Sequence, residues 1–195
     1  MLDGLYPLDS AHLSVAHDQT IHLARLVEDL RVLTLAEAKR LPLERATLDM
    51  IPLVNGLVEA FEPLALDAEI RLTRDLPDGL PSVLADPTRI RQVLSNLLNN
   101  ALRHTPDGGE IHIRLAQQAE YISVQVSNTV SNLNPQDLGY MFDPFWRSAA
   151  AREQDKGGSG LGLAISREII TLHGGTLTVS SADGRIRFTF TLPKG

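Results

Sequence analysis

Residues 86–105 read DPTRIRQVLSNLLNNALRHT, which is the pattern of a single amphipathic helix. Asp86 is a favourable N-cap, and Pro87 suits the first helical position because a proline there loses no helical hydrogen bond. Apolar residues recur along the stretch at helical spacing: Ile90, Val93, Leu94, Leu97, Leu98 and Ala101. The segment therefore predicts a helix that buries one face in a core.

The same helix carries a second line of side chains, and these are polar. Gln92, Asn96, Asn100 and Arg103 are spaced four, four and three residues apart, so at about 100° per residue they face one side. Asparagine costs a helix about half a kcal/mol relative to alanine, and a function would account for that cost. An amide oxygen can bind Mg²⁺ without repelling a triphosphate, and a guanidinium can bind a phosphate. The alternative is an exposed polar face without a ligand.

A glycine-rich stretch follows later in the chain. Residues 157–165 read GGSGLGLAI and place glycines at positions 158, 160 and 162, directly before residues with helical apolar spacing. Glycine lets backbone N–H groups approach a polyanion closely, and the N-terminus of a helix favours negative charge. The stretch therefore predicts a phosphate-binding loop, although glycines before a helix also serve tight turns and close packing.

Together these motifs resemble the catalytic ATP-binding domain of bacterial sensor histidine kinases, members of the GHKL ATPase superfamily. The N box of that family is matched by residues 96–101, its phenylalanine motif by residues 142–145 and its glycine box by residues 158–162, in the same order. The resemblance implies ATP and Mg²⁺ as cofactors and transfer of the γ-phosphoryl group to a histidine. No such acceptor histidine is identified in this chain.

The resemblance also implies roles for individual residues. Asn96 and Asn100 would be the catalytic residues and would hold the Mg²⁺ ion. Further nucleotide-binding residues would come from four segments: Arg103, His104, Asn128, Arg147, Lys156, Gly158, Ser159, Gly160, Leu161, Gly162 and Leu163. Residues 146–157 would form a lid over the nucleotide, and the alternative for them is an ordinary solvated loop or a short exposed helix.

One segment departs from the family pattern. Asn128 aligns with the aspartate that accepts a hydrogen bond from the adenine amino group, and Val130 and Asn132 replace two glycines. An asparagine oxygen can still accept that bond, without the charge. We therefore expect weaker adenine binding than in the family at large.

The N-terminal part predicts a long helix over residues 10–38, with an apolar stripe of Leu23, Leu26, Val27, Leu30 and Leu33. Residues 25–30 resemble the second helix of the family's dimerisation hairpin. His17 and Asp18 begin like an acceptor motif, but no proline follows, so we interpret His17 as an ordinary polar helix residue. We expect residues 1–42 to be the remnant of a dimerisation and phosphoacceptor domain and residues 43–195 to be the catalytic domain.

The remaining periodicity predicts the fold. Two further helices are expected over residues 50–66 and 161–173, and alternating apolar residues predict strands at 70–72, 83–84, 111–115, 122–126, 177–179 and 186–192. We expect an α+β fold, a two-layer α/β sandwich of the GHKL type. Its mixed sheet would pack against three helices, preceded by the long N-terminal helix.

Composition excludes some classes of partner. The 195 residues carry a net charge of −6 without a basic cluster, which argues against nucleic acid, and the absence of cysteine suits the cytoplasm. No stretch is long and apolar enough to span a membrane, so any anchor is expected in upstream sequence. The resemblance implies a response regulator and the phosphoacceptor helix as partners, and a homodimer for the full-length kinase.

Three hypotheses for the function follow. The first is the ATP-binding catalytic core of a two-component sensor histidine kinase. The second is a catalytically weak module that senses nucleotide or binds a partner, motivated by the altered adenine motif at Asn128, Val130 and Asn132. The third is another class of the superfamily, such as a serine kinase of an anti-sigma pathway or an ATPase clamp, and the resemblance of residues 25–30 argues against it.

Overall fold

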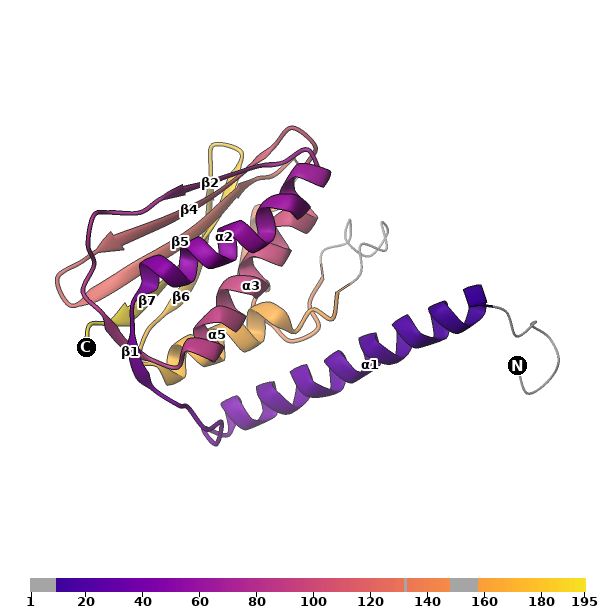
Figure 1. Cartoon of the computed structure of the whole chain (residues 1–195), viewed down its shortest axis with the longest axis horizontal. Helices are drawn as coiled ribbons and strands as arrows, with labels where there is room; N and C mark the ends of the chain where they lie inside the picture. The colour runs from indigo at the N-terminus through magenta and orange to yellow at the C-terminus, as the bar shows by residue number, and fades with distance from the viewer. Residues whose placement is uncertain (1–9, 132, 148–157) are drawn as a thin grey trace.

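The protein folds into a sheet and a helical layer, with a long helix alongside (Figure 1). The computed structural model describes residues 10–131, 133–147 and 158–195. Helices α2 (Met50–Asp67), α3 (Pro87–His104) and α5 (Gly162–Leu172) pack on one face of the sheet. The predicted two-layer sandwich with three helices on a mixed sheet is confirmed.

The main sheet has five strands in the order β2-β4-β5-β7-β6. The strands are β2 (Arg71–Asp75), β4 (Glu110–Gln117), β5 (Tyr121–Thr129), β6 (Leu177–Ala182) and β7 (Arg185–Pro193). Strand β2 pairs in parallel with β4, and the other neighbours pair antiparallel. Asp183 and Gly184 both have positive φ and form the predicted hairpin turn between β6 and β7. Strand β7 therefore lies inside the sheet, between β5 and β6.

Two short elements were not predicted from the sequence. Strand β1 (Ala46–Leu48) pairs with β3 (Val83–Ala85) in a separate two-stranded sheet, and η1 (Pro135–Gly139) is a 3₁₀ turn capped by Asn134. Each has three to five residues, and such short stretches give only a weak periodic signal.

Helix α3 has the predicted cap and the predicted buried face. The Asp86 carboxylate accepts hydrogen bonds from the backbone N–H groups of Thr88 and Arg89, at 2.9 and 3.1 Å. Its other oxygen accepts one from the N–H of Glu44 at 2.9 Å. All six residues of the apolar stripe are at most 1% exposed. The N-terminus of α3 is thus fixed both within the helix and to the segment that precedes β1.

A buried histidine joins the ends of α3 and α5. The Nε2 atom of His173 accepts a hydrogen bond from the backbone N–H of Asp86 at 3.0 Å, and its Nδ1 atom lies 2.8 Å from the carbonyl oxygen of Ile169. Burial is the main cause that lowers the pKa of His173, and the charge of Arg45 lowers it further; the bond to Ile169 and the Asp86 charge oppose this. The folded state therefore favours the neutral form of the His173 imidazole.

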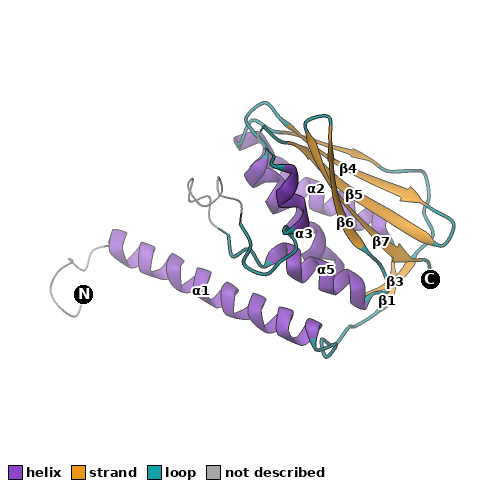
Figure 2. Ribbon diagram, turned by 180° about the vertical axis from the view of Figure 1, so that it is seen from behind, coloured by secondary structure: helices purple, strands orange, loops and turns teal. Residues whose placement is uncertain are grey.

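Helix α1 (Ser10–Glu37) lies along the helical layer and contacts α5 (Figure 2). Val32, Leu33 and Ala36 in its last turns are buried. The predicted stripe is buried only in part, because Leu23, Val27 and Leu30 are about half exposed or more. No helix in the described part of the chain is both long enough and apolar enough to cross a bilayer.

Candidate nucleotide-binding site

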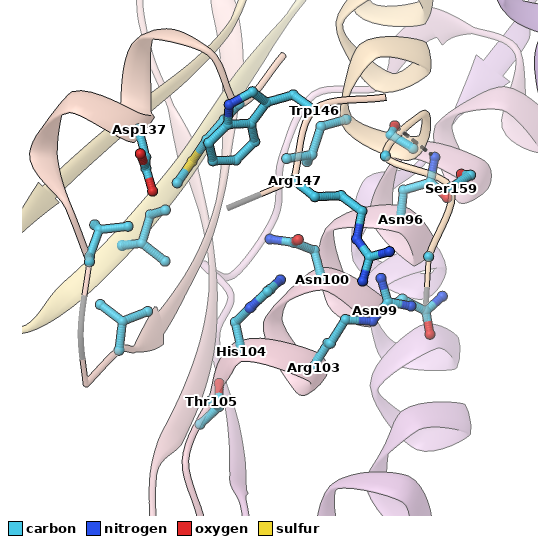
Figure 3. Close-up of a pocket in the computed structure, with 18 of the residues that line it drawn as sticks. Asn96, Asn99, Asn100, Arg103, His104, Thr105, Asp137, Trp146, Arg147 and Ser159 are labelled. Carbon is cyan, nitrogen blue, oxygen red and sulfur yellow. Dashed lines mark hydrogen bonds between the residues drawn. The ribbon is translucent and has the colours of Figure 1, made fainter. Parts of the chain in front are cut away.

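A cavity of about 590 Å³ lies between α3, residues 158–162 (the glycine loop) and the segment after β5. Its lining comes from six parts of the chain: Arg25, Asp29, Asn96, Asn99, Asn100, Arg103, His104, Thr105, Pro106, Val130, Ser131, Leu133, Asp137, Met141, Trp146, Arg147, Gly158, Ser159, Gly160, Gly162, Leu163 and Ile186. Figure 3 shows the polar side chains of α3 and Arg147 converging on this space. The polar face of α3 and the glycine loop are therefore brought to one site.

The polar line predicted on α3 enters the cavity in three of its four positions. Asn96, Asn100 and Arg103 line the space, whereas the fourth member, Gln92, does not. The amide oxygen of Gln92 accepts a hydrogen bond from Arg89 at 3.0 Å. At 1.5 Å per residue, Gln92 lies about 6 Å before Asn96 along the axis. The expectation that Gln92 faces the same place is therefore wrong.

Asn96 ties the helix to the glycine loop. Its Nδ2 atom donates to the carbonyl oxygen of Gly162 at 3.0 Å and to the hydroxyl oxygen of Ser166 at 3.3 Å. The Ser166 hydroxyl itself donates to the Gly162 carbonyl at 2.7 Å. These bonds use the amide nitrogen of Asn96, so its oxygen is the atom available to a cation.

Two guanidinium groups meet at the mouth of the glycine loop. Figure 3 shows the side chains of Arg103 and Arg147 pointing toward one another. Partial burial, and then the charge of Arg147, lower the pKa of Arg103. A Cβ atom at Gly158 would overlap the Arg103 guanidinium, so only glycine permits this close approach. Both guanidinium groups line the cavity, so both are placed to contact an anionic ligand in it.

The glycine loop is shaped by its contact with the phenylalanine motif. The backbone N–H of Phe145 donates to the Gly160 carbonyl at 3.0 Å. A Cβ atom at Gly160, where φ is +69°, would lie 2.7 to 2.9 Å from the backbone of Phe145 and Trp146. Phe145 itself has φ of +64°, a conformation that bulky residues rarely adopt. The motif thus holds the loop open toward the cavity, while Phe142 is buried in the core.

The cavity also has an apolar part. Val130, Leu133, Met141 and Ile186 line the cavity, together with the carboxylate residue Asp137. Asn128 pairs with Ile186 across β5 and β7 and is 1% exposed. Its Nδ2 atom donates to the Thr129 carbonyl at 3.1 Å, whereas its Oδ1 atom is buried without a hydrogen-bond partner among the described residues. Asn128 does not itself line the cavity, whereas its strand partner Ile186 does. An unpaired buried acceptor next to this lining fits a ligand that has an N–H group on a flat ring.

Comparison of the sequence with known protein families also points to a nucleotide-binding domain. Residues 85–195, more than half of the chain, match the family described as histidine kinase-, DNA gyrase B- and HSP90-like ATPase. The chain belongs to this ATPase family. The match starts just before α3 and covers every segment of the cavity lining except the two residues of α1.

Individual members of the ATPase family resemble the chain over more of its length. It is 32% identical over 184 residues to the sensor histidine kinase WalK of Bacillus subtilis (strain 168), covering 93% of this chain and 30% of WalK. The structure of the Acinetobacter baumannii histidine kinase AdeS has a TM-score of 0.82 at 27% identity and covers 100% of this chain and 89% of that chain. Full-length ShkA, solved in complex with AMPPNP, has a TM-score of 0.84 at 25% identity and covers 98% of this chain and 40% of that chain. The chain spans about a third of the length of the curated relatives that it matches.

Most of the other residues predicted to bind nucleotide lie at the cavity. His104, Gly158, Ser159, Gly160, Gly162 and Leu163 line the cavity with the α3 residues and Arg147. Leu161 does not line it: its side chain is 1% exposed, and its N–H donates to the Ser159 hydroxyl oxygen at 3.2 Å. Lys156, Asn132 and residues 148–157 of the expected lid lie outside the described residues.

Several residues of the site are not among those predicted from the sequence. Asn99 is one of them, although it lies within the N box at residues 96–101 and could have been predicted from that motif. Ile186 and Thr105 gave no signal, since each belongs to a pattern that predicts only packing or a helix end. Arg25 and Asp29 come from α1, and only the packing of α1 against α5 brings them to the cavity.

Proposed function

We propose that this chain is the ATP-binding catalytic part of a two-component sensor histidine kinase. The presence of Arg103, Arg147 and the glycine loop in one cavity supports this most directly, because guanidinium groups and backbone N–H groups bind the phosphates of a triphosphate. Backbone N–H groups of the glycine loop and the N-terminus of α5 would bind the same phosphates. The relatives are named sensor histidine kinases, so a module without kinase activity is not favoured.

The adenine would lie in the apolar part of the cavity. Its 6-amino group would donate a hydrogen bond to the Asn128 Oδ1 atom, which has no other partner in the described residues. The flat ring would pack against Val130, Leu133, Met141 and Ile186. Asn128 would thereby take the role that an aspartate has elsewhere in the family.

Mg²⁺ fits the polar face of α3 by its chemistry. No group of three or more histidine, cysteine, aspartate or glutamate residues that could hold a metal occurs in the described part of the chain. The ligands would be the amide oxygens of Asn100 and Asn96 together with phosphate oxygens. When bound, the ion would neutralise the charge of the phosphates.

The reaction would be transfer of the γ-phosphoryl group to an imidazole nitrogen. A nitrogen–phosphorus bond forms, the bond between the γ-phosphorus and the bridging oxygen breaks, ADP leaves, and the imidazole gives up its proton to solvent. The acceptor histidine, the response regulator and a second copy for dimerisation would belong to the full-length kinase, in the cytoplasm where ATP is available. The boundary between a dimerisation segment at residues 1–42 and a catalytic domain at residues 43–195 also remains a prediction.

Calorimetric titration with ATP, with and without Mg²⁺, tests the proposal. We expect Mg²⁺-dependent binding that is weakened at least about tenfold in Asn100→Ala, the cost of one lost metal ligand or charge-assisted contact. Gln92→Ala is the matched control, because Gln92 is a polar residue of the same helix that does not line the cavity. A folded wild-type protein that binds no ATP would contradict the proposal, and so would an unchanged Asn100→Ala variant.

A further inference from the structure

Helix α1 contributes two charged residues to the cavity, and no motif of the ATPase domain accounts for them. Arg25 and Asp29 lie one helical turn apart and both line the space. The helix is held there by Val32, Leu33 and Ala36, which are buried in contact with the layer that contains α5 (Figure 2). Asp29 thus lies just before the part of α1 that is anchored.

Asp29 meets the glycine loop at its central residue. Asp29 and Ser159 line the same cavity, and the Ser159 side chain is close enough to lower the pKa of the Asp29 carboxyl. Ser159 lies between Gly158 and Gly160. Burial is the main cause that raises the pKa of Asp29, and the charge of Glu28 adds to it, whereas the Ser159 side chain opposes it. The carboxylate therefore stands in a partly desolvated position that disfavours its charge.

The same position is the phosphate end of the cavity. Gly158, next to Ser159, is in contact with the Arg103 guanidinium. A phosphate bound by the loop and Arg103 would have the Asp29 carboxylate as a neighbour of like charge. A phosphate oxygen can also accept a hydrogen bond from the Ser159 hydroxyl. The phosphate and the Asp29 carboxylate would therefore compete for this donor.

We propose that Asp29 makes the docking of α1 and the binding of nucleotide phosphates mutually unfavourable, so that a triphosphate displaces the Asp29 turn of α1 from the glycine loop. This inference rests on the proposed function, because the ligand it names is a nucleoside triphosphate. The coupling is reciprocal: whatever moves the Asp29 carboxylate away from the glycine loop raises the affinity for ATP, and ATP weakens the docking of the Asp29 turn.

The burial along α1 fits such a movement. Leu23, Val27 and Leu30, which flank Asp29, are 60%, 61% and 48% exposed. The turns that contain Asp29 are therefore held weakly, whereas the turns from Val32 to Ala36 are held by apolar burial. The helix can tilt about its anchored end without exposing more of the core.

Nucleotide affinity tests the charge effect. Asp29→Asn removes the charge but keeps an oxygen that can accept a hydrogen bond from Ser159, and Glu28→Gln removes one charge from the neighbouring residue, which pairs with Arg31 instead. Both variants have the same net charge. Binding of ATP with Mg²⁺, and of adenosine, is measured by calorimetry and by the fluorescence of Trp146, the single tryptophan of the chain.

We expect Asp29→Asn to bind ATP about five- to tenfold more tightly than wild type at low salt, with a smaller gain at high salt. Adenosine should bind all three proteins equally, and Glu28→Gln should stay within about twofold of wild type for both ligands. ATP binding by Asp29→Asn that is no tighter than by Glu28→Gln overturns the inference alone. ATP binding by none of the proteins overturns the proposed function, and the inference with it.

A distance measurement tests the movement. The chain has no cysteine, so spin labels can be attached at Leu23→Cys on α1 and Leu66→Cys on α2, both at exposed positions. We expect saturating ATP with Mg²⁺ to lengthen or broaden the distance between the labels, and adenosine to leave it unchanged. An unchanged distance with bound ATP overturns the proposed displacement.

Discussion

Asn128 is a single residue on which the base preference of the proposed site depends. In the described structure its Oδ1 atom is buried without a hydrogen-bond partner, and such an atom costs about 1–3 kcal/mol. A ligand that donates a hydrogen bond to Oδ1 would recover that cost. The resemblance to the family motif implies an aspartate at this position, and an asparagine also offers an acceptor oxygen there.

Replacing this acceptor should remove discrimination between purines that differ at position 6. We expect wild type to bind ATP about tenfold more tightly than purine riboside triphosphate, which lacks the 6-amino group, and Asn128→Ala to bind both alike. Ser127→Ala is the control, because successive residues of a strand face opposite sides of the sheet. Competition titrations measure both ratios. Persistent preference for ATP in Asn128→Ala would show that another residue reads the base.

The glycine loop is the element whose backbone conformation shapes the proposed site. Its φ values of +130° at Gly158 and +69° at Gly160 place the backbone where side chains would collide with Arg103 and with the backbone of residues 145 and 146. The loop requires glycine for both space and conformation at these two positions. Alanine at either position would therefore change the site as well as the stability.

The Gly158→Ala variant should separate the effect on nucleotide binding from the effect on stability. Its Cβ would displace the Arg103 guanidinium, so we expect ATP affinity to fall more than about tenfold. Gly79→Ala is the control, because Gly79 has φ of +81° but open space around it. Both variants should lose about 1 kcal/mol of stability from backbone strain, seen as lower thermal midpoints. Equal ATP affinities in the two variants would contradict this account of the loop.

Elements with strong periodicity could be predicted from the sequence, and contacts between distant elements could not. The cap and stripe of α3 follow from local rules at Asp86 and Pro87. The polar line on α3 was predicted one turn too long, because the spacing that places Gln92 on the same side says nothing about where the cavity ends. The approach of Asp29 to Ser159 depends on how α1 packs, and no local pattern encodes that.

At the scale of the whole molecule, the buried imidazole of His173 links the helical layer to the start of α3. Its lowered pKa means that the unfolded state binds a proton more readily than the folded state. The stabilisation that the neutral His173 contributes is therefore fully present above about pH 6.5, the ordinary histidine pKa. It is lost as the pH falls toward the lowered pKa of the folded state.

We expect the free energy of unfolding to decrease between about pH 7 and pH 5. The loss should be on the order of 1 kcal/mol, since protonation of Nε2 breaks the bond from the Asp86 N–H. Urea denaturation at several pH values measures it, and His173→Gln should give a flatter profile over the same range. Glu110, whose pKa is lowered chiefly by its bond to Arg185, contributes only below about pH 4.5. A His173→Gln profile as steep as that of wild type would assign the effect elsewhere.

The position of β7 has a consequence for biosynthesis. This strand pairs on one side with β5 and on the other with β6, and it supplies Ile186 to the cavity. During translation the helices and β2 to β5 emerge from the ribosome first, but the sheet cannot close until residues 185–193 are free to insert. The cavity is therefore complete only after β7 has left the exit tunnel, and until then the backbone N–H and C=O groups along one edge of β5 lack their strand partner.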